Sequence, residues 1–481
     1  MPAGGGVIQI AAVGRQNAHL NGNPDHTLFK TQHRRYTSFA EDLEYNDFSS
    51  GSVGFTQKVS AAISRYGDLV SDIMLEVKLP ALSAPTEAQY ITAGATDASG
   101  TAIVVGDLAD DSSRSAYWVN AIGFALLAEV SIEIGGTDID TLYPEWMYFW
   151  EEMTQRPGAR LGEQIGKFSY SDDVEADMVE FASQARCLYV PLQFWFNKYF
   201  MEHGLSIPLI ALSYHEIRVR VTFRSIAECT VCTFVDESLT VTDTISRNTL
   251  VSGLVPINGS TASTLVNADL EARLLVSYVY LDAEERNAFS SVEHEYLITT
   301  VQRQQHNITS ALATSDQIKI FFNHPSNCLT WMVRPSEYLA GSSRRRYSVG
   351  HKDMFDFSLA TTDAPSAALP YGDVTDATKS ASLTLNGHSR WPTDLPGLFF
   401  RQTVPVMKWT NASDGYMYVF NFSARGGAWQ PTSTLNMSRI DHVQLELKYG
   451  SNMPVSEVLI FAESYNLFIV KEGMGGIRYS N

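Results

Sequence analysis

The sequence predicts an all-β protein built from two β-sandwiches in tandem, and three observations support this prediction. Short stretches that alternate apolar and polar residues recur along the 481 residues, which is typical of antiparallel strands with one buried face. Aromatic residues reach 11%, and their side chains suit pleated, half-buried surfaces. One order of strands and turns occurs twice. A chain of this length accommodates two large β domains as readily as three small ones.

The strictest alternation lies in three segments, 73–79, 217–223 and 443–447. Apolar residues occupy every second position in each, so we expect strands with one face buried. The segment 274–281 is almost wholly apolar and rich in β-formers. We expect it to be a strand that is buried on both faces.

Helical signals are few and short. Pro144 opens a stretch that reaches Met153, and proline is favoured at the first helical position. Residues 282–286 predict one short helix with acidic side chains near its N-terminus. We expect long insertion loops at 80–115 and 341–378, because loops of that length in compact domains usually serve a surface function.

The repeated order begins with two similar hairpins. Residues 131–136 (SIEIGG) resemble residues 382–387 (SLTLNG), and each runs from an alternating strand into a glycine turn. An aromatic segment follows each hairpin, at 189–197 and 418–422, and then one of the alternating strands. Two copies of one sandwich joined near 224–270 explain this order, and chance similarity of unrelated hairpins is the alternative.

Charge and composition exclude several classes of function. The formal net charge of −18 opposes binding to nucleic-acid phosphates or to an anionic membrane, so we expect no direct nucleic-acid partner. The longest apolar run, 121–128, is too short to cross a bilayer, and the start does not resemble a signal peptide. Four cysteines are too few for a disulfide-stapled scaffold. We therefore expect a soluble protein from a reducing compartment.

Catalytic motifs are missing from the sequence. There is no phosphate-binding loop and no nucleophile elbow. His215 and His294 are each followed by glutamate, as in zinc proteases, but Val219 and Ile298 stand where a second histidine is needed. We expect no enzyme activity, no catalytic residues and no cofactor.

Two further groups have the spacing of metal or redox sites. Cys229 and Cys232 have the spacing of a metal or redox pair, but there is no second pair, so ordinary cysteines are favoured. Three histidines repeat every seven residues: His19, His26 and His33. A proline between the first two interrupts any helix that would bring them together. We expect no metal site.

Five sequons make asparagines candidates for N-glycosylation: Asn258, Asn307, Asn411, Asn421 and Asn436. The motif arises often by chance, and no secretory signal precedes it. Unmodified asparagines are the favoured alternative.

Several short segments become informative when taken together and in order. They are 20–24 (LNGNP), 27–30 (TLFK), 34–40 (RRYTSFA), 51–55 (GSVGF), 63–69 (ISRYGDL), 190–192 (VPL), 194–196 (FWF) and 473–476 (GMGG). This ordered set resembles the major capsid proteins of the nucleocytoplasmic large DNA viruses, as in phycodnaviruses, iridoviruses and mimivirus relatives. The resemblance runs from about residue 20 to the C-terminus. The insertion after Pro80 and the loop 341–378 depart from the family pattern.

The resemblance implies two tandem eight-stranded antiparallel jelly rolls with short helices and long insertion loops. We expect an N-terminal arm at 1–50, a first jelly roll at 51–228, a linker region at 229–268 and a second jelly roll at 269–481. Residues 32–44 should contact neighbours at the base of the assembly. The two long loops should crown its outer surface, and the aromatic segments 146–150 and 194–200 should be core by default.

The resemblance also implies a function, a structural subunit of an icosahedral capsid located in the outer shell of the virion. Three chains with two similar sandwiches each present six similar units, so a homotrimer can form a pseudo-hexagonal capsomer. Implied partners are neighbouring capsomers, minor capsid and penton proteins, and an internal membrane that the chain covers without spanning it. A carbohydrate-binding minor capsid or spike protein and a β-sandwich hydrolase are the alternatives.

Overall fold

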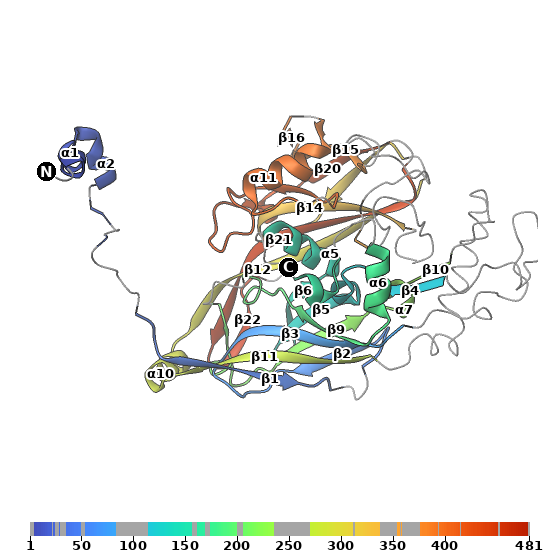
Figure 1. Ribbon diagram of the computed structural model, residues 1–481, viewed down its shortest axis with the longest axis horizontal. Helices are drawn as coiled ribbons and strands as arrows, with labels where there is room; N and C mark the ends of the chain where they lie inside the picture. The colour runs from blue at the N-terminus through green and yellow to red at the C-terminus, as the bar shows by residue number, and fades with distance from the viewer. Residues whose placement is uncertain are drawn as a thin grey trace, which may run out of the picture. The chain divides into compact units, whose positions relative to one another are not determined.

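The computed structural model describes residues 4–21, 23–24, 28, 35–49, 53–82, 114–155, 161–168, 174–199, 205–234, 270–310, 313–336, 354–355, 357, 376–392, 394–413, 415–450 and 453–479. The chain divides into a small unit, Met1–Phe39, and a large unit, Ala40–Asn481. The small unit contains α1 (Gly4–Ala11), the 3-10 turn η1 (Arg15–Asn17) and α2 (Ala18–Asn21). Everything below concerns the large unit (Figure 1).

Eight strands form a first sandwich of two facing sheets (Figure 1). One sheet has the order β1 (Phe39–Asn46), β11 (Glu271–Leu281), β3 (Leu69–Leu79) and β7 (Arg186–Pro191). The other has the order β2 (Lys58–Ala62), β9 (Ile217–Phe223), β5 (Leu127–Ile134) and β6 (Thr137–Leu142). Alternate residues of both sheets, such as Leu75 and Val219, are buried in one core.

Eight other strands form a second sandwich. One sheet has the order β12 (His294–Ile308), β21 (Ser456–Lys471), β14 (Pro325–Pro335) and β18 (Tyr418–Asn421). The other has the order β13 (Ser315–Ile320), β20 (Val443–Tyr449), β15 (Thr378–Leu385) and β16 (His388–Ser389). Its own core includes Trp331 and Leu445, one from each sheet.

The two sandwiches repeat one topology. When the eight strands of each are counted in chain order, the first sheet runs 1-8-3-6 and the second 2-7-4-5 in both sandwiches. The two hairpins singled out in the sequence lie at the same place, since β5 pairs with β9 and β15 pairs with β20. The internal repeat is therefore confirmed, and chance similarity of unrelated hairpins is excluded.

Shorter strands and helices lie between or beside the sixteen strands of the two sandwiches. The further strands are β4 (Arg114–Trp118), β8 (Ile207–Pro208), β10 (Thr230–Phe234), β17 (Leu395–Pro396), β19 (Leu435–Asn436) and β22 (Met474–Ile477). The helices are α4 (Ile122–Ala125), α5 (Pro144–Thr154), η4 (Gly162–Ile165), α6 (Val174–Ala182), α7 (Ile226–Cys229), α10 (Ala283–Ser291), η7 (Phe399–Thr403), α11 (Val404–Lys408) and η8 (Met437–Arg439). In the described part of the chain, no helix combines the length and apolar character that crossing a membrane requires.

The predicted elements are present where the alternation or capping was strong. Segments 73–79, 217–223 and 443–447 lie in β3, β9 and β20, and the two predicted helices are α5 and α10. The sequence did not predict η7 and α11. Their run of aromatic and β-branched residues favours a strand, and Pro405 is tolerated only because it lies at the start of α11.

Two strands bear on the predicted domain ranges. Strand β1 lies within the expected arm 1–50, and β11 lies within the expected second jelly roll, yet both belong to the first sandwich. This pairing favours a boundary after β11, and the four ranges themselves stay a prediction. The expectation that 274–281 is buried on both faces is correct in part, since Ser277 and Val279 on the outward face are also buried. Leu274 and Val276 are fully buried, whereas Leu275 on the outward face is half-exposed.

Candidate functional site at the junction of the two sandwiches

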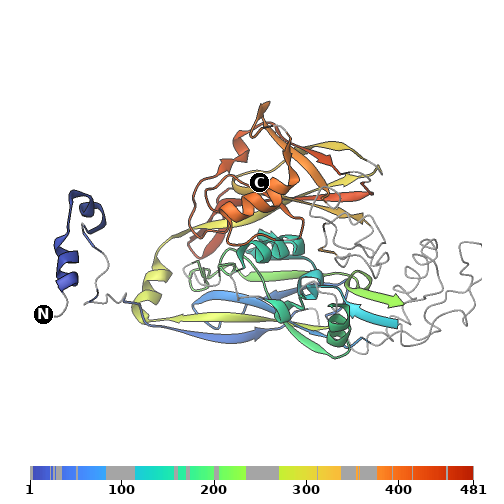
Figure 2. The same cartoon turned by 45° about the horizontal axis from the view of Figure 1, so that its top comes forward.

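Helix α5 lies between the sandwiches and supplies aromatic side chains to their junction (Figures 1 and 2). Pro144 stands at its first turn, after an extended residue, which is where proline starts helices. The ring centroid of Trp146 lies 6.1 Å from that of Phe461 on β21. Trp150 packs edge-on against Trp409, 5.9 Å away. These rings are buried, as expected for 146–150, so the junction is a continuation of the core.

Strands β14 and β21 are buried on both faces because of this helix. Trp331 and Ile460 face the core of the second sandwich. Met332 and Phe461, their neighbours in sequence, belong to the cluster that contains the first sandwich and α5. Successive residues of a strand point to opposite faces, so the sheet separates two apolar layers.

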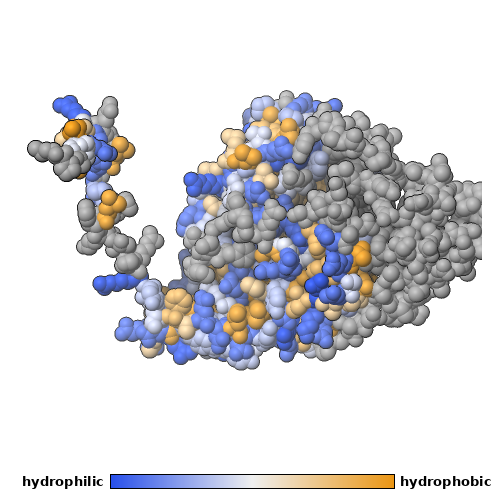
Figure 3. Space-filling view, viewed as in Figure 1, coloured by the Kyte–Doolittle hydropathy of each residue, from blue (hydrophilic) through white to orange (hydrophobic). Residues whose placement is uncertain are grey.

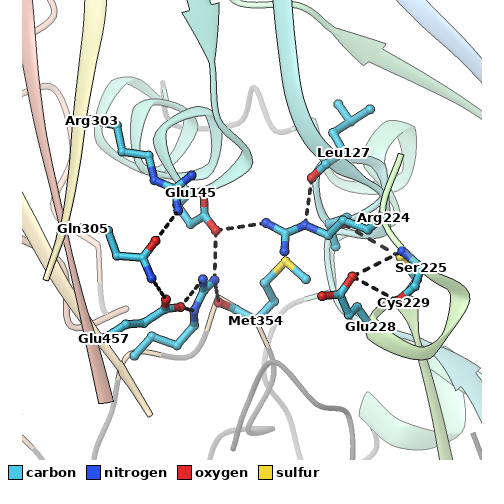
Figure 4. A network of polar contacts seen from close by, with 12 residues as sticks. Leu127, Glu145, Arg224, Ser225, Glu228, Cys229, Arg303, Gln305, Met354 and Glu457 are labelled. Carbon is cyan, nitrogen blue, oxygen red and sulfur yellow. Dashed lines mark hydrogen bonds and ion pairs between the residues drawn. The ribbon is translucent and has the colours of Figure 1, made fainter. Parts of the chain in front are cut away.

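A buried carboxylate lies at the centre of the junction (Figure 4). Glu145 of α5 is inaccessible to solvent, and its Oε1 atom accepts hydrogen bonds from Arg334 Nη1 at 3.0 Å and Arg224 Nη2 at 3.2 Å. Burial alone would raise the pKa of Glu145, but Arg334, Arg224 and Arg303 together lower it to about 2. The carboxylate is therefore charged at neutral pH and ties α5 to β14.

The network continues across the second sandwich (Figure 4). Arg334 Nε donates to Glu457 Oε1 on β21 at 2.6 Å. Gln305 Nε2 on β12 donates to the other oxygen of Glu457 at 2.7 Å, and Arg303 Nη2 donates to Gln305 Oε1 at 3.3 Å. Three strands and one helix thus share one polar network, in which loss of Arg334 would take a cation from two buried carboxylates, Glu145 and Glu457.

A second buried pair joins the loop after β7 to β21. Lys198 forms an ion pair with Glu463, and both side chains are almost inaccessible to solvent. Asn327 Nδ2 on β14 donates to Glu463 Oε2 at 2.8 Å. The ammonium group of Lys198 lies 4.5 Å from the ring centroid of Trp150. Residue 198 belongs to the aromatic segment 194–200, whose aromatic residues 194–196 are buried as expected.

Asp140 connects the edge strands of the two sandwiches. Its Oδ1 atom accepts hydrogen bonds from the backbone N–H groups of Val301 on β12 and of Thr141, each at 3.0 Å. Burial raises the pKa of Asp140 to about 7, although the two N–H donors and Lys198 act in the opposite direction. A groove of about 620 Å³, lined mainly by residues of β6, β12 and the C-terminal segment, lies beside this contact.

The C-terminal hairpin fastens the second sandwich to the first. The N–H of Tyr214 donates to the carbonyl of Gly473 at 3.0 Å, and the N–H of Gly475 donates to His215 Nδ1 at 3.1 Å. A Cβ atom on Gly475 would lie 2.6 Å from Leu212 Cδ2, and Gly473 has φ +81°. Backbone conformation at Gly473 and close approach at Gly475 therefore explain two of the three glycines of the 473–476 motif.

Five charged residues of the junction, among others, were not singled out in the sequence: Glu145, Lys198, Arg334, Glu457 and Glu463. A signal existed for two of them. Arg334 and Glu463 interrupt apolar stretches whose neighbours on both sides are buried. A charge in a strand of that kind is expected to have a buried partner, but the alternation does not identify the partner.

At two of the predicted glycosylation sites, the asparagine side chain forms hydrogen bonds within the chain. Asn421 is 2% exposed, and its Oδ1 accepts a hydrogen bond from Trp409 Nε1 at 2.7 Å, so the folded chain has no room for a glycan there. Asn411 is half-buried, and its Nδ2 donates to the carbonyl of Glu152 at 3.0 Å.

The other three sequons have different surroundings. Asn307 on β12 and Asn436 on β19 are exposed, and glycosylation stays a prediction for them. Asn258 lies outside the described residues.

The residues weighed as metal or redox sites behave as structural groups wherever they are described. Cys229 is buried, which raises the pKa of its thiol to about 12. Val219 and Ile298 are core residues of strands, so neither histidine-glutamate pair lies on a helix. The side chains of His19, His26, His33 and Cys232 lie outside the described residues. Among the described residues, no group of three or more His, Cys, Asp or Glu could hold a metal ion.

The two long loops are described only in part. Residues 83–113 lie outside the described residues, as does most of 341–378. Met354, Phe355 and Phe357 are described and buried, and the ring of Phe355 stacks on Tyr148 of α5 with centroids 4.5 Å apart. The outer-surface position expected for these loops stays a prediction, and the described residues of the second loop are all buried, Ala377 included.

Comparisons with known proteins agree with this architecture. A family model for the N-terminus of major capsid proteins matches residues 27–282, and one for the major capsid protein of large eukaryotic DNA viruses matches residues 285–476. The major capsid protein of Paramecium bursaria Chlorella virus 1 is 30% identical over 99% of this chain and all of its own length. That of Pyramimonas orientalis virus is 29% identical with the same coverage. A solved structure of the PBCV-1 virus capsid matches with a TM-score of 0.68 at 26% identity, covering 95% of this chain and 100% of its own.

Proposed function

This chain belongs to the major capsid proteins of large eukaryotic DNA viruses, structural subunits of the virion shell, and from that premise we propose that three copies form a pseudo-hexagonal capsomer. The observation that carries the proposal is the repeat of the 1-8-3-6 and 2-7-4-5 sheets in both sandwiches. Three chains then present six similar units around one axis, and such a tile packs among hexagonal neighbours.

The junction supports this arrangement because it fixes the two sandwiches relative to each other. The buried ion pairs of Glu145 and Glu463 and the C-terminal hairpin all cross between the sandwiches. Partly satisfied buried charges are costly, so another relative orientation of the two sandwiches would be strongly disfavoured. A rigid pair is what a tile with constant angles requires.

The proposed partners are neighbouring capsomers, minor capsid and penton proteins, and an internal membrane beneath the shell that the chain does not span. The net charge of −18 argues against direct contact with the genome. Because the relatives are structural capsid proteins, we propose no catalytic role. The four domain ranges are part of this proposal, with the first jelly roll extended to include β1 and β11.

Size-exclusion chromatography with light scattering tests the trimer directly. We expect a mass three times the 53.3 kDa of one chain at micromolar concentration, and hexagonal outlines in electron micrographs. A stable monomer would contradict the capsomer. A glycan array addresses the carbohydrate-binding alternative, and saturable binding of one glycan class would favour it.

A further inference from the structure

Three polar side chains meet at one point of the junction without access to water. Lys198, Asn327 and Glu463 are 5%, 2% and 0% exposed, respectively. Hydrophilic residues, blue in Figure 3, are otherwise spread over the described surface, where water reaches them. Lysine and glutamate are almost never buried to this extent unless they are paired. The group combines an amine, a carboxamide and a carboxylate in one apolar place.

Glu463 bridges the other two side chains. Its Oε1 atom forms an ion pair with the Nζ atom of Lys198, and its Oε2 atom accepts a hydrogen bond from Asn327 Nδ2 at 2.8 Å. Because both oxygens belong to one carboxylate, the amine and the carboxamide lie beside the same group. A carboxylate that touches two partners in this way can carry a proton from one to the other.

A β-bulge in β14 presents Asn327 to this carboxylate. The register between β14 and β21 shifts between Ser326 and Cys328, so Asn327 is the extra residue of the bulge. Its backbone carbonyl accepts the N–H of Phe422 at 2.9 Å instead of taking part in the ladder with β21. Bulges of this kind redirect a side chain, and they are frequent beside reactive sites.

The carboxamide of Asn327 is only half satisfied. Its Oδ1 atom is buried, and no group among the described residues donates a hydrogen bond to it. Buried polar atoms nearly always have a partner, and an exception indicates strain or a chemical role. A purely structural asparagine at this position would be expected to use both ends of its amide.

Aromatic side chains enclose the three groups. The Nζ atom of Lys198 lies 4.5 Å from the ring centroid of Trp150 and 5.2 Å from that of Tyr199. Tyr465 is also near, since burial and, after it, the charge of Glu463 raise the pKa of its hydroxyl. Such an enclosure excludes water, which would otherwise solvate the amine and keep it away from the amide carbon.

We propose that Lys198 and Asn327 form an intramolecular isopeptide bond, with Glu463 transferring the protons. A bond forms between Nζ of Lys198 and Cγ of Asn327, and the bond from Cγ to Nδ2 breaks and releases one ammonium ion. Nothing is oxidised or reduced, and no co-reactant is needed. The reaction happens once within each chain and is therefore compatible with a structural protein that turns over no substrate.

Proton transfer through Glu463 balances the reaction. Glu463 takes one proton from the ammonium group of Lys198, and the neutral amine attacks Cγ of Asn327. The new O–H group of Glu463 donates to Oδ1 as charge develops there and to Nδ2 as that nitrogen leaves, because rotation about Cβ–Cγ exchanges the two atoms. The second proton lost by Nζ follows the same path. The nitrogen therefore leaves as ammonium, and Glu463 is again a carboxylate.

The bond connects the loop after β7 to β14 and so crosses between the two sandwiches. Residues 198 and 327 are far apart in sequence, and a covalent link that closes a long loop stabilises a fold mainly by restricting the unfolded chain. The link adds a covalent tie to the ion pairs of the junction. It acts within one chain, and the capsomer does not depend on it.

A second set of the same groups provides an internal comparison. Lys167 forms ion pairs with Glu151 and Glu152, and Gln155 Nε2 donates to Glu151 Oε1 at 2.9 Å. The side chain of Lys167 is 14% exposed, and Gln155 is half-buried. Water reaches this amine and this amide, so we expect no bond between them.

Mass spectrometry of the purified full-length chain tests the proposal directly. We expect an intact mass lower than that of the sequence by one ammonia. A tryptic digest should contain one branched peptide that joins Lys198 to Asn327, because trypsin does not cut after an acylated lysine. Lys198→Arg and Asn327→Ala should each abolish the branched peptide, and Glu463→Gln should slow its formation at least roughly 100-fold.

Lys167→Arg is the matched control and should leave the branched peptide unchanged, while circular dichroism should show that all variants are folded. Separate peptides with unmodified Lys198 and Asn327 in the wild-type chain would overturn the proposal without recourse to any variant. Loss of one water, with Lys198 joined to Glu463, would also overturn it. A branched peptide that forms equally fast in Glu463→Gln would overturn the proton transfer. None of these outcomes bears on the trimer, which light scattering measures separately.

Discussion

The 1-8-3-6 sheets of the two sandwiches share a topology and differ in their surroundings. In the second sandwich, α5 covers the outward face of β14 and β21, and that face carries the ion pair of Arg334 with Glu457 and Glu145. In the first sandwich, the outward face of β3 and β11 carries an ion pair of Arg273 with Glu76. Both faces carry a charge pair, and the neighbouring layer decides how strongly the arginine of each pair is desolvated.

The two arginines, Arg334 and Arg273, differ accordingly in how exposed their side chains are. The side chain of Arg334 is 2% exposed, and that of Arg273 is 38% exposed, although Arg273 also lies 3.6 Å from the ring centroid of Tyr45. A desolvated charge that loses its partner costs several kcal/mol, whereas a pair with access to water contributes little.

The largest expected effect follows from that contrast. Arg334→Met should lower the free energy of unfolding by about 3–5 kcal/mol, because Glu145 and Glu457 remain buried without their shared cation. Arg273→Met should lower it by less, because Arg273 is partly solvated and the buried Glu76 keeps the hydrogen bond from the hydroxyl of Tyr45. Chemical denaturation of both variants measures the difference. Equal losses would contradict the claim that the covering layer decides the energetics.

The two hairpins provide a second contrast. Gly135 and Asn386 occupy the same turn position with φ of +61° and +47°, so the backbone conformation itself accepts asparagine. A Cβ atom on Gly135 would lie 2.2 Å from His215 Nδ1. We expect Gly135→Asn to cost about 3 kcal/mol through this overlap and Asn386→Gly to cost about 1 kcal/mol through its lost side-chain hydrogen bond.

Thermal and chemical unfolding of these two variants separate the explanations. If Gly135→Asn were no more costly than Asn386→Gly, the proximity of His215 would have no role in selecting glycine, and the hairpins would be equivalent.

The smallest expected effect concerns the edge strands. Asp140 binds β12, and its pKa is about 7 in the folded chain against an ordinary value of 3.8. The folded state then holds a proton that the unfolded state has released, so the free energy of unfolding should fall by about 2 kcal/mol as pH rises from 5 to 8.

Asp140→Asn is the informative control, since its amide oxygen still accepts the Val301 hydrogen bond without titrating. Unfolding measured across this pH range should show that most of the slope disappears in the variant. An unchanged slope would mean that the stability of β12 does not depend on the proton of Asp140.

The candidate site could be predicted from the sequence only in its apolar part. The aromatic residues of 146–150 were expected to be core, and Trp146 and Trp150 are buried at the junction. The partners of Glu145 could not be found in this way, because Arg334 is distant in sequence and strand alternation carries no information on which face of one sandwich meets the other.

By itself, the sequence determined the all-β class, the positions of the alternating strands and the existence of a repeat, because side-chain period and turn residues act over a few neighbouring positions. Tertiary structure alone decided that β11 closes the first sandwich, that α5 is buried while Val406 and Met407 of α11 are exposed, and which charges meet at the junction. Those outcomes depend on contacts between segments far apart in the chain. The helix or sheet that packs on a face determines how buried its side chains are and which charges lie near them.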